Sequence, residues 1–484
     1  MLGIKAKMLG EQKARKQRRV QARSAGFYPA RMALLGLGIA ISVGTALLML
    51  PVARSGAPMW PGNVPVAVAG PSIAGGAPLS VALFTATSAT CVTGLIVVDT
   101  ATYWSTFGHA VIAILIEVGG LGAMTFAALL AVYVAHRLSL SQRLVVAQIT
   151  GALTMSDMRG FVRRIVRMAL IVQVVLAIPL VIDFYARSKS LGEALQWGTF
   201  FSISAFNNAG FSLETDSLIP FATDPFIILP ISILIVIGGL GFPVLAEIVH
   251  ACKTRRKRRW PWSLNARLVV HGTIGLILTG WLLITLLEWN NLSQTGQYSV
   301  ADRLLITLFT AISPRTAGFN SMDIATQSDV TWLVTDILMF IGAGPAGTAG
   351  GVKITTMLVL VFLVLTEIRA GQAVQLFGSR IGRSTQRAAI TVLMIAFSLV
   401  VGATAIIMVL TPWGMDPVLY EVISALSTVG LTTGITPQLP IAAQLIICAL
   451  MFFGRVGPVA VATVLTIRPD TKLYELPKER PIIG

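Results

Sequence analysis

Charged residues are scarce in this sequence. Only 12% of its 484 residues are Asp, Glu, Lys or Arg, whereas 55% are hydrophobic, and the mean hydropathy is +0.79. A soluble globular domain has about 25% charged residues. The composition therefore excludes a soluble protein and predicts a polytopic membrane protein.

Cysteine and histidine are also rare. The three cysteines, Cys91, Cys252 and Cys448, lie far apart in the sequence and predict neither a disulfide framework nor a metal site. The four histidines match no metal-ligand spacing, and the His-Glu-x-x-His and Gly-x-Ser-x-Gly motifs are absent. The residues that a membrane-embedded enzyme would need are therefore missing.

The N-terminus lacks the features of a cleavable signal peptide. Residues 1–31 form a basic arm, and the apolar run 32–52 that follows has no small-residue cleavage site. That run is long enough to cross about 30 Å of hydrocarbon. We expect it to be a retained first transmembrane helix that starts in the cytoplasm.

The formal net charge is +16, which on its own could indicate nucleic-acid binding. The basic residues, however, cluster beside apolar runs, at 137–167, 253–267 and 369–387. The intervening segments carry few basic residues, namely Arg54, Arg187, Lys189 and Arg303, and they carry the acids Asp99, Glu214, Asp216, Asp224, Asp323, Asp329 and Asp416. This asymmetry follows the positive-inside rule, so it predicts eight spans with both termini cytoplasmic and no nucleic-acid partner.

A short motif occurs four times along the chain. Each copy has a small residue and Ala, then small or polar residues, then a glycine followed by an apolar residue. The glycines are Gly94, Gly210, Gly318 and Gly430, and the intervals between them are 116, 108 and 112 residues. Four copies at a nearly constant spacing indicate an internally repeated fold.

Each copy lies between two apolar runs, at the end of an apolar segment too short to cross a membrane. The predicted span, half-helix and span are 32–52, 79–89 and 107–136; 162–184, 191–206 and 226–250; 268–289, 301–312 and 330–367; and 388–410, 417–426 and 441–467. We therefore predict an all-α polytopic membrane protein of four tandem span–pore-helix–span repeats around one pore with pseudo-fourfold symmetry. The predicted units are the cytoplasmic arm 1–31 and the repeats 32–136, 137–250, 251–368 and 369–484, the last with a short cytoplasmic C-terminus.

The half-helices and glycine loops predict a cation filter. Backbone carbonyl oxygens can replace the hydration shell of an ion, and the partly negative C-terminal end of each half-helix favours a cation. Irregular backbone at membrane depth survives only if it is buried or lines water. The predicted filter residues are Thr90, Cys91, Val92, Thr93, Gly94, Asn207, Asn208, Ala209, Gly210, Arg315, Thr316, Ala317, Gly318, Ser427, Thr428, Val429 and Gly430. Cys91 is expected to serve as a small polar filter residue, and the alternative for all four loops is a set of structural turns without a pore.

These stretches resemble the Trk/Ktr/HKT superfamily of potassium transport proteins, and most of all the membrane subunits of bacterial Ktr systems. The similarity runs from about residue 26 to the C-terminus. The most specific motifs are 93–95, 207–211, 315–320, 347–353 and 452–458. Members with an additional helix pair before the first repeat differ from this chain, which has only the basic arm there.

The resemblance implies a bacterial cytoplasmic membrane protein that takes up K⁺, with Na⁺ as a possible second ion and no directly bound cofactor. It also implies a homodimer in which each chain forms its own pore within the membrane lipid. A further implied partner is a cytoplasmic ring of nucleotide-binding regulatory subunits of the KtrA type. The basic segments 255–259 and 380–387 are candidates for docking that ring, although their charge also fits simple control of topology.

The third repeat is expected to contain a gate. Five glycines and a proline between Gly342 and Gly351 must break the helix. The segment matches the dinucleotide fingerprint by spacing alone, because no strand precedes it, and Lys353 follows Val352 where a phosphate-binding loop needs Gly. In the superfamily the equivalent segment is a mobile intramembrane loop below the filter. The predicted gate residues are Gly342, Gly344, Gly347, Thr348, Gly350, Gly351, Lys353 and Arg455.

Arg455 lies deep in the last predicted span. An arginine at the centre of a membrane helix costs about 2.5–3.5 kcal/mol, so it should face a partner or water. We expect it near the pore below the filter, in contact with the gate. The alternative is a packing or snorkelling arginine, and Glu117, Glu247 and Asp336 are the intramembrane acids that could pair with it.

Two other features leave alternatives open. The glycines at 119–122 and 238–241 are expected to allow close helix packing. A secondary carrier with inverted repeats and broken helices is a rival transporter class, but the four predicted copies run in the same orientation.

Overall fold

The computed structural model describes residues 34–60, 66, 67, 72, 74–135, 157–187, 189–254, 262–295, 298–371 and 373–457, without the side chains of 123–135, 157–159, 161, 252–254 and 293–295. The predicted cytoplasmic arm, the basic run 255–259, Cys252 and the chain beyond residue 457 fall outside this description. The described chain is mostly helical, as the sequence predicts.

The helices follow the predicted order of long, short and long segments. The first group is the helix Leu34–Leu48, then α2 (Leu79–Cys91), α3 (Thr100–Tyr103) and α4 (Thr106–Ala135). The second group is α6 (Asp157–Ala186), α7 (Leu191–Asn207), α8 (Pro225–Leu240) and α9 (Phe242–Thr254). The third group is α10 (Leu264–Thr295), α11 (Val300–Ile312), α12 (Asp329–Phe340) and α13 (Ile354–Ile368). The fourth group is α14 (Arg383–Leu410), α15 (Met415–Ser427) and α16 (Ile441–Val456).

Shorter elements connect these helices. Within the described residues, 3-10 helices occur at Pro51–Ala53, Ile219–Phe221, Ile324–Thr326 and Thr436–Gln438. The strands β1 (Gln375–Leu376) and β2 (Ser379–Arg380) form an antiparallel hairpin. Its two turn residues, Phe377 and Gly378, have φ of +48° and +77°, as a tight hairpin turn requires.

Local sequence explains where the short helices begin. Ser190 before α7 accepts a hydrogen bond from the Glu193 N–H, and the Glu193 side chain accepts one from the Ser190 N–H. Ser299 and Asp302 form the same reciprocal cap before α11. Such caps satisfy N–H groups that a helix start leaves without partners, so these helices start at fixed points beneath the loops that precede them.

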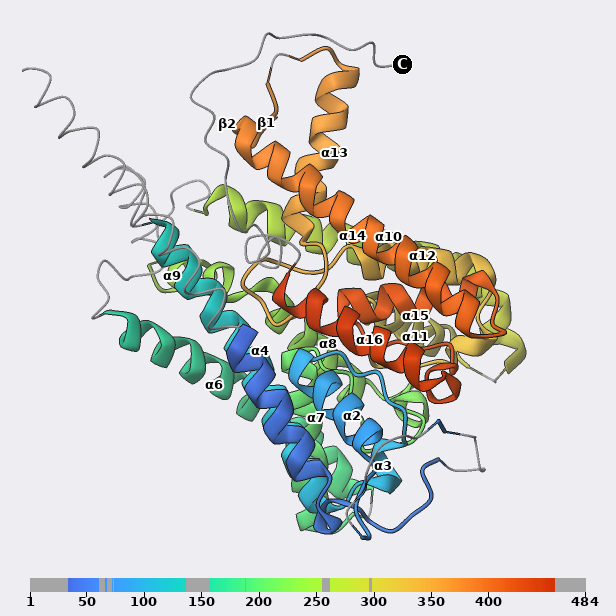
Figure 1. The fold of residues 1–484 in the computed structure, drawn as a ribbon. Coiled ribbons are helices and arrows are strands. Elements are labelled where there is room, and N and C mark those ends of the chain that lie inside the picture. Colours follow the sequence, from blue (N-terminus) through green and yellow to red (C-terminus); the bar gives the residue numbers. More distant parts are fainter. Residues whose placement is uncertain are drawn as a thin grey trace, which may run out of the picture.

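The four short helices α2, α7, α11 and α15 lie toward the middle of the molecule, with longer helices around them (Figure 1). Helix contacts run from one group to the next: α4 with α7, α8 with α11, α12 with α15, and α16 with α2. The last of these contacts joins the end of the chain to its beginning. The described helices therefore close into a ring.

Three described helices are long and apolar enough to cross a membrane: Val162–Ala186, Leu264–Leu292 and Arg383–Leu410. Only 28% of each apolar window is buried inside the protein, so these helices present apolar faces outward. The predicted single span 226–250 is wrong as a straight helix, because α8 and α9 form a pair bent by 104°. The bend falls at Gly241, whose φ is +86°, a value outside the helical range.

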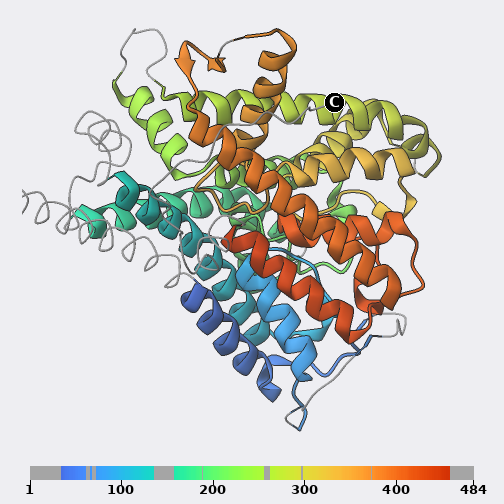
Figure 2. The ribbon, with the colours of Figure 1, turned by 45° about the horizontal axis from the view of Figure 1, so that its top comes forward.

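The predicted break in span 330–367 is present. α12 ends at Phe340 and α13 begins at Ile354, with a non-helical segment between them. α13 and the β1–β2 hairpin project from one side of the molecule in both views (Figures 1 and 2). One large apolar cluster, contributed by all four groups of helices, packs around the central short helices.

Candidate functional site

The four glycine stretches adopt one backbone conformation. Two residues before each glycine, a non-glycine residue has φ between +52° and +68°, and the glycine itself has φ between +71° and +96°. The pairs are Val92 and Gly94, Asn208 and Gly210, Thr316 and Gly318, and Thr428 and Gly430. Positive φ is uncommon for residues other than glycine. The four stretches therefore share a local fold as well as a sequence pattern, and we call them loops 1 to 4.

In loops 1, 2 and 4 the left-handed residue caps the short helix that precedes the loop. In three loops the next residue donates its N–H to a serine carbonyl oxygen: Thr93 to Ser88 at 2.8 Å, Ala209 to Ser204 at 2.7 Å and Val429 to Ser424 at 2.8 Å. This pattern is a common way to close a helix C-terminus. Loop 3 differs, since α11 ends at Ile312 and Ala317 donates to Ser313 at 2.9 Å.

Each loop abuts the next one in the chain, and the fourth returns to the first. A Cβ atom added to each ring glycine would lie within 3 Å of a carbonyl oxygen of the next loop. A Cβ on Gly94 would lie 2.4 Å from the Ala209 oxygen, and a Cβ on Gly210 would lie 2.9 Å from the Ala317 oxygen. A Cβ on Gly318 would lie 2.4 Å from the Val429 oxygen, and a Cβ on Gly430 would lie 2.0 Å from the Thr93 oxygen. The chain comes this close only because these positions have no side chain. The loops form a closed ring of backbone.

All four ring glycines line a single cavity of about 480 Å³, which we call the mouth. Four acidic residues line the same cavity: Asp99, Glu214, Asp216 and Asp323. Burial raises the pKa of Glu214, and the nearby Asp216 carboxylate raises it further, while Lys189 lowers it. A cavity with this concentration of acidic side chains attracts cations.

The four short helices direct their C-terminal ends at the ring. Unsatisfied carbonyl groups give such an end a partial negative charge. The carboxylates of the mouth lie on one side of the ring and the helix ends meet at the ring itself. Both features stabilise a cation and oppose an anion.

The segment 341–353 between α12 and α13 packs against α8 and against the end of α15 at loop 4. Its backbone pairs with itself, since Gly342 donates to Val352 at 2.8 Å, and with α8, since Gly344 donates to Gly239 at 2.9 Å. A Cβ on Gly350 would lie 2.2 Å from the Thr428 hydroxyl oxygen. The segment therefore packs directly against loop 4.

Two cationic side chains hold this segment. Arg455 donates from Nη1 to the carbonyl oxygen of Thr348 and from Nη2 to that of Gly119 at 2.7 Å. Lys353 donates to the carbonyl oxygens of Ala349 at 2.6 Å and Gly350 at 3.1 Å. Three consecutive carbonyl groups, 348 to 350, thus accept hydrogen bonds from two positive charges.

Comparison with known proteins identifies the fold and the family. Residues 66–475 match the family described as TrkH, cation transport protein. The chain belongs to this family. The family consists of cation transporters and not of enzymes.

The chain is similar to several curated proteins over most of their length. The chain is 36% identical over 89% of its length to the Ktr system potassium uptake protein B of Bacillus subtilis, and covers 92% of that protein. It is 34% identical to the protein of the same name from Vibrio alginolyticus, with 83% of this chain and 88% of that one covered. It is 33% identical to the potassium/sodium uptake protein NtpJ of Enterococcus hirae, with 83% and 89% covered.

A solved structure shares the fold. The crystal structure of the potassium transporter TrkH from Vibrio parahaemolyticus superposes with a TM-score of 0.64, covering 81% of this chain and 79% of that one, at 18% identity.

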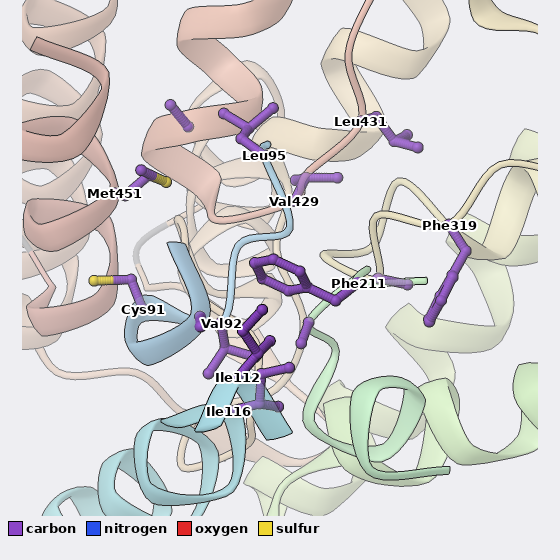
Figure 3. Packing of buried hydrophobic residues seen from close by; sticks show 14 of the residues in the cluster. Cys91, Val92, Leu95, Ile112, Ile116, Phe211, Phe319, Val429, Leu431 and Met451 are labelled. Atoms are coloured by element: carbon purple, nitrogen blue, oxygen red, sulfur yellow. The ribbon is translucent and has the colours of Figure 1, made fainter. Parts of the chain in front are cut away.

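The transporter places several predicted filter residues differently from the sequence expectation. The Cys91 thiol is fully buried in the apolar cluster, and in Figure 3 it points away from Val92 and Phe211. The Cys91 side chain thus packs among apolar residues. Arg315 is 5% exposed, and its Nη1 donates to the Thr273 carbonyl oxygen at 3.3 Å, so its side chain is anchored to α10.

Asn207, at the end of α7, links loop 2 to α4 through its side chain. Its amide donates to the Glu117 carboxylate at 2.6 Å, and Gln173 donates to the same carboxylate at 3.1 Å. The Glu117 carboxylate therefore binds side chains of α6 and α7. Glu247 accepts from the Ser263 N–H at 2.9 Å and its hydroxyl at 2.8 Å. None of the acids suggested by the sequence as a partner for Arg455 forms an ion pair with it in the described chain, and backbone carbonyls take that place.

Gly119 and Gly238 have the packing role expected for them, and Gly454 has the same role. A Cβ on Gly119, Gly238 or Gly454 would lie 1.9 Å from a carbonyl oxygen near the end of a short helix: Thr90, Phe206 and Leu426, respectively. These glycines let the outer helices approach the ring. In the third repeat Gly342 instead meets the Gly350 carbonyl oxygen, at 2.5 Å, because the chain has left the helix there.

Sequence reasoning missed one buried acid beside the ring. Glu421 on α15 is 1% exposed and accepts hydrogen bonds from Thr432, Thr433 and Thr436. The available signal was an acid within an apolar half-helix, where a carboxylate is rare.

Proposed function

We propose that this chain conducts K⁺ across the bacterial cytoplasmic membrane through the ring of loops 1 to 4, which acts as a selectivity filter. One observation carries the proposal: the four ring glycines line a single acidic cavity and each abuts the next loop. Relatives named for potassium uptake support the choice of ion.

The proposed path begins at the mouth. Carboxylates there raise the local concentration of cations. The ion then exchanges its water shell for carbonyl oxygens at residues 90–94, 207–210, 315–318 and 427–430. Cys91 and Arg315 contribute only their backbone carbonyl groups to this filter, because the Cys91 side chain packs in the apolar cluster and the Arg315 side chain is hydrogen-bonded to Thr273. Fixed dipoles of the helix ends offset the cost of dehydrating the ion.

The segment 341–353 is the proposed gate. It packs against loop 4, it is non-helical, and Arg455 and Lys353 hold it through carbonyl groups. These two charges also repel a cation at this depth. In the closed state the segment blocks the path, and release of the two cationic contacts opens it.

The remaining parts of the proposal concern assembly and coupling. Four repeats, 32–136, 137–250, 251–368 and 369–484, form one pore per chain, with both termini cytoplasmic and two chains in a dimer. The Ktr names of the relatives imply a multi-component system, so a nucleotide-binding ring of the KtrA type is the proposed partner at the cytoplasmic face. Na⁺ is the second candidate ion, since one relative is named for potassium and sodium.

Rubidium and potassium uptake into vesicles tests the function. The purified full-length chain should carry K⁺ and Rb⁺ in preference to Na⁺. Gly94→Ser should lower the K⁺/Na⁺ flux ratio, because a side chain there meets the Ala209 carbonyl oxygen and restricts a backbone at positive φ. An unchanged ratio in a folded Gly94→Ser protein would contradict the carbonyl filter.

A further inference from the structure

Loop 4 is held by a carboxylate from its own short helix, at a position where two of the other short helices carry phenylalanine. Nine residues before the ring glycine the four short helices carry Thr85, Phe201, Phe309 and Glu421. Both phenylalanines are fully buried, and Phe201 packs on Phe319 of loop 3 at a ring separation of 6.0 Å. The position nine residues before the ring glycine is therefore a buried phenylalanine in α7 and α11 and a buried acid in α15.

Glu421 binds the part of loop 4 that continues into the mouth. Its Oε1 accepts from the Thr432 hydroxyl and from the Thr433 N–H, the latter at 3.0 Å. Its Oε2 accepts from the Thr436 hydroxyl at 2.7 Å. Thr432 and Thr433 line the mouth together with Gly430. Oε1 therefore fixes two consecutive residues, Thr432 and Thr433, and Oε2 fixes Thr436.

A buried carboxylate is expensive unless hydrogen bonds replace its water. Hydrogen bonds to a charged group are stronger and more directional than neutral ones. Loop 4 also lacks the aromatic residue that follows the glycine in loops 2 and 3: Leu431 stands where those loops have Phe211 and Phe319. The Glu421 carboxylate thus holds loop 4 through hydrogen bonds, whereas loops 2 and 3 have aromatic residues at both of these positions.

We infer that Glu421 is a positioning residue that sets ion specificity by fixing residues 429–433 of loop 4 through Thr432, Thr433 and Thr436. It does not contact the ion. A ring that discriminates ions by carbonyl geometry needs each loop held in place. Loosening one of four loops lets the ring adapt to a smaller ion, so discrimination falls before conduction does.

The inference rests on the proposed filter function, and the chain offers a matched control for it. Glu288 is also fully buried and accepts four hydrogen bonds, from the Ser328 N–H and hydroxyl, Thr331 and Asn291. These bonds fix the start of α12, outside the four loops. Glu288 and Glu421 are therefore comparable in burial and in the hydrogen bonds that they accept, so replacing either one removes a similar carboxylate.

The test compares K⁺ and Na⁺ flux in vesicles for wild type, Glu421→Ala, Glu421→Gln and Glu288→Ala, all as full-length protein with unchanged oligomeric state. Glu421→Ala should lower the K⁺/Na⁺ ratio at least about threefold, a change smaller than the full worth of one lost charged hydrogen bond. Glu421→Gln should restore most of the ratio, since its amide oxygen still accepts from loop 4. Glu288→Ala should lower thermal stability and leave the ratio unchanged.

Two outcomes overturn the inference: an unchanged ratio in Glu421→Ala, or equal falls in Glu421→Ala and Glu288→Ala. If Glu421→Ala does not fold, Thr432→Val replaces it, because this variant keeps the carboxylate and removes one loop contact. An unchanged ratio in folded Thr432→Val would then be the contradicting result. Absence of K⁺ flux in wild type would instead reject the proposed function, so the two failures are distinguishable.

Discussion

The Arg455 guanidinium donates a hydrogen bond to the backbone carbonyl oxygen of Thr348, 107 residues earlier in the chain. Arg455 is only 8% exposed, and Thr348 is fully buried. A charge from the last described helix thus holds the segment that packs against loop 4. The contact is to backbone, so it depends on the fold of the segment and not on the identity of one side chain.

Arg455→Ala should raise K⁺ flux. It removes hydrogen bonds from a charged donor, each worth about 1.5–3 kcal/mol, and it removes a positive charge from the proposed path. If half of one such bond favours the closed segment, flux should rise about threefold to tenfold. Vesicle flux on folded protein measures this, and Arg455→Lys, which keeps the charge but loses the second contact, should lie between the two. Flux at or below wild type in Arg455→Ala would reject Arg455 as a latch.

Shortening the segment should also raise flux. Deletion of residues 346–347 removes part of the segment while Arg455 stays in place. Deletion of residues 377–378 from the hairpin turn is the control, because it removes the same number of residues outside the ring. If the segment is only a packing kink, its deletion will destabilise the fold and flux will not exceed that of the hairpin deletion.

Gly430→Ala should abolish selective flux. Its Cβ would lie 2.0 Å from the Thr93 carbonyl oxygen, closer than any real contact, and the residue has φ of +94°. Gly434→Ala is the matched control, since Gly434 has the same φ but nothing within 4 Å of its added Cβ. Backbone strain of about 1–3 kcal/mol is common to both. Equal loss of selective flux in the two variants would show that strain, and not closure of the ring, is responsible.

As the external pH is lowered at low ionic strength, K⁺ flux should begin to fall at a higher pH than it would if the carboxylates of the mouth had ordinary pKa values. Burial and Asp216 raise the pKa of Glu214 above its ordinary value of 4.5, so Glu214 takes up a proton at a higher pH. Below that pKa the mouth is less negative and attracts fewer cations, and above it the full charge is present. Initial Rb⁺ uptake measured against external pH reports the effect.

Glu214→Gln should remove this part of the pH dependence and lower uptake at neutral pH. Glu193→Gln serves as its control, because Glu193 is exposed, caps α7 outside the mouth and has a pKa lowered by the Ser190 N–H. Identical pH profiles for wild type and Glu214→Gln would exclude Glu214 from the cation path. High salt should reduce the difference, since it screens exposed charges.

The order of long and short helices in this transporter was readable from its residues. Apolar length, the four spaced glycines and the basic loops predicted the order of long and short helices, and the glycines and proline at 342–351 predicted the break between α12 and α13. These features are local: a glycine or proline changes the backbone at its own position. The bend at Gly241 is also local, yet it was not predicted, because the same glycine pattern suits a straight, closely packed helix.

The sequence by itself determined which residues could form loops and where helices must end, since those depend on backbone conformation and hydrophobicity over a few residues. Only the tertiary structure decided which groups meet. Arg455 reaches Thr348 and Gly119, Asn207 reaches Glu117, and the Cys91 thiol turns into the apolar cluster. Glu421 was missed by the sequence analysis, and the fold brings Thr432 and Thr436 to its carboxylate. Such partners are set by how helices pack around the ring, and no periodicity in one helix encodes the side chains of another.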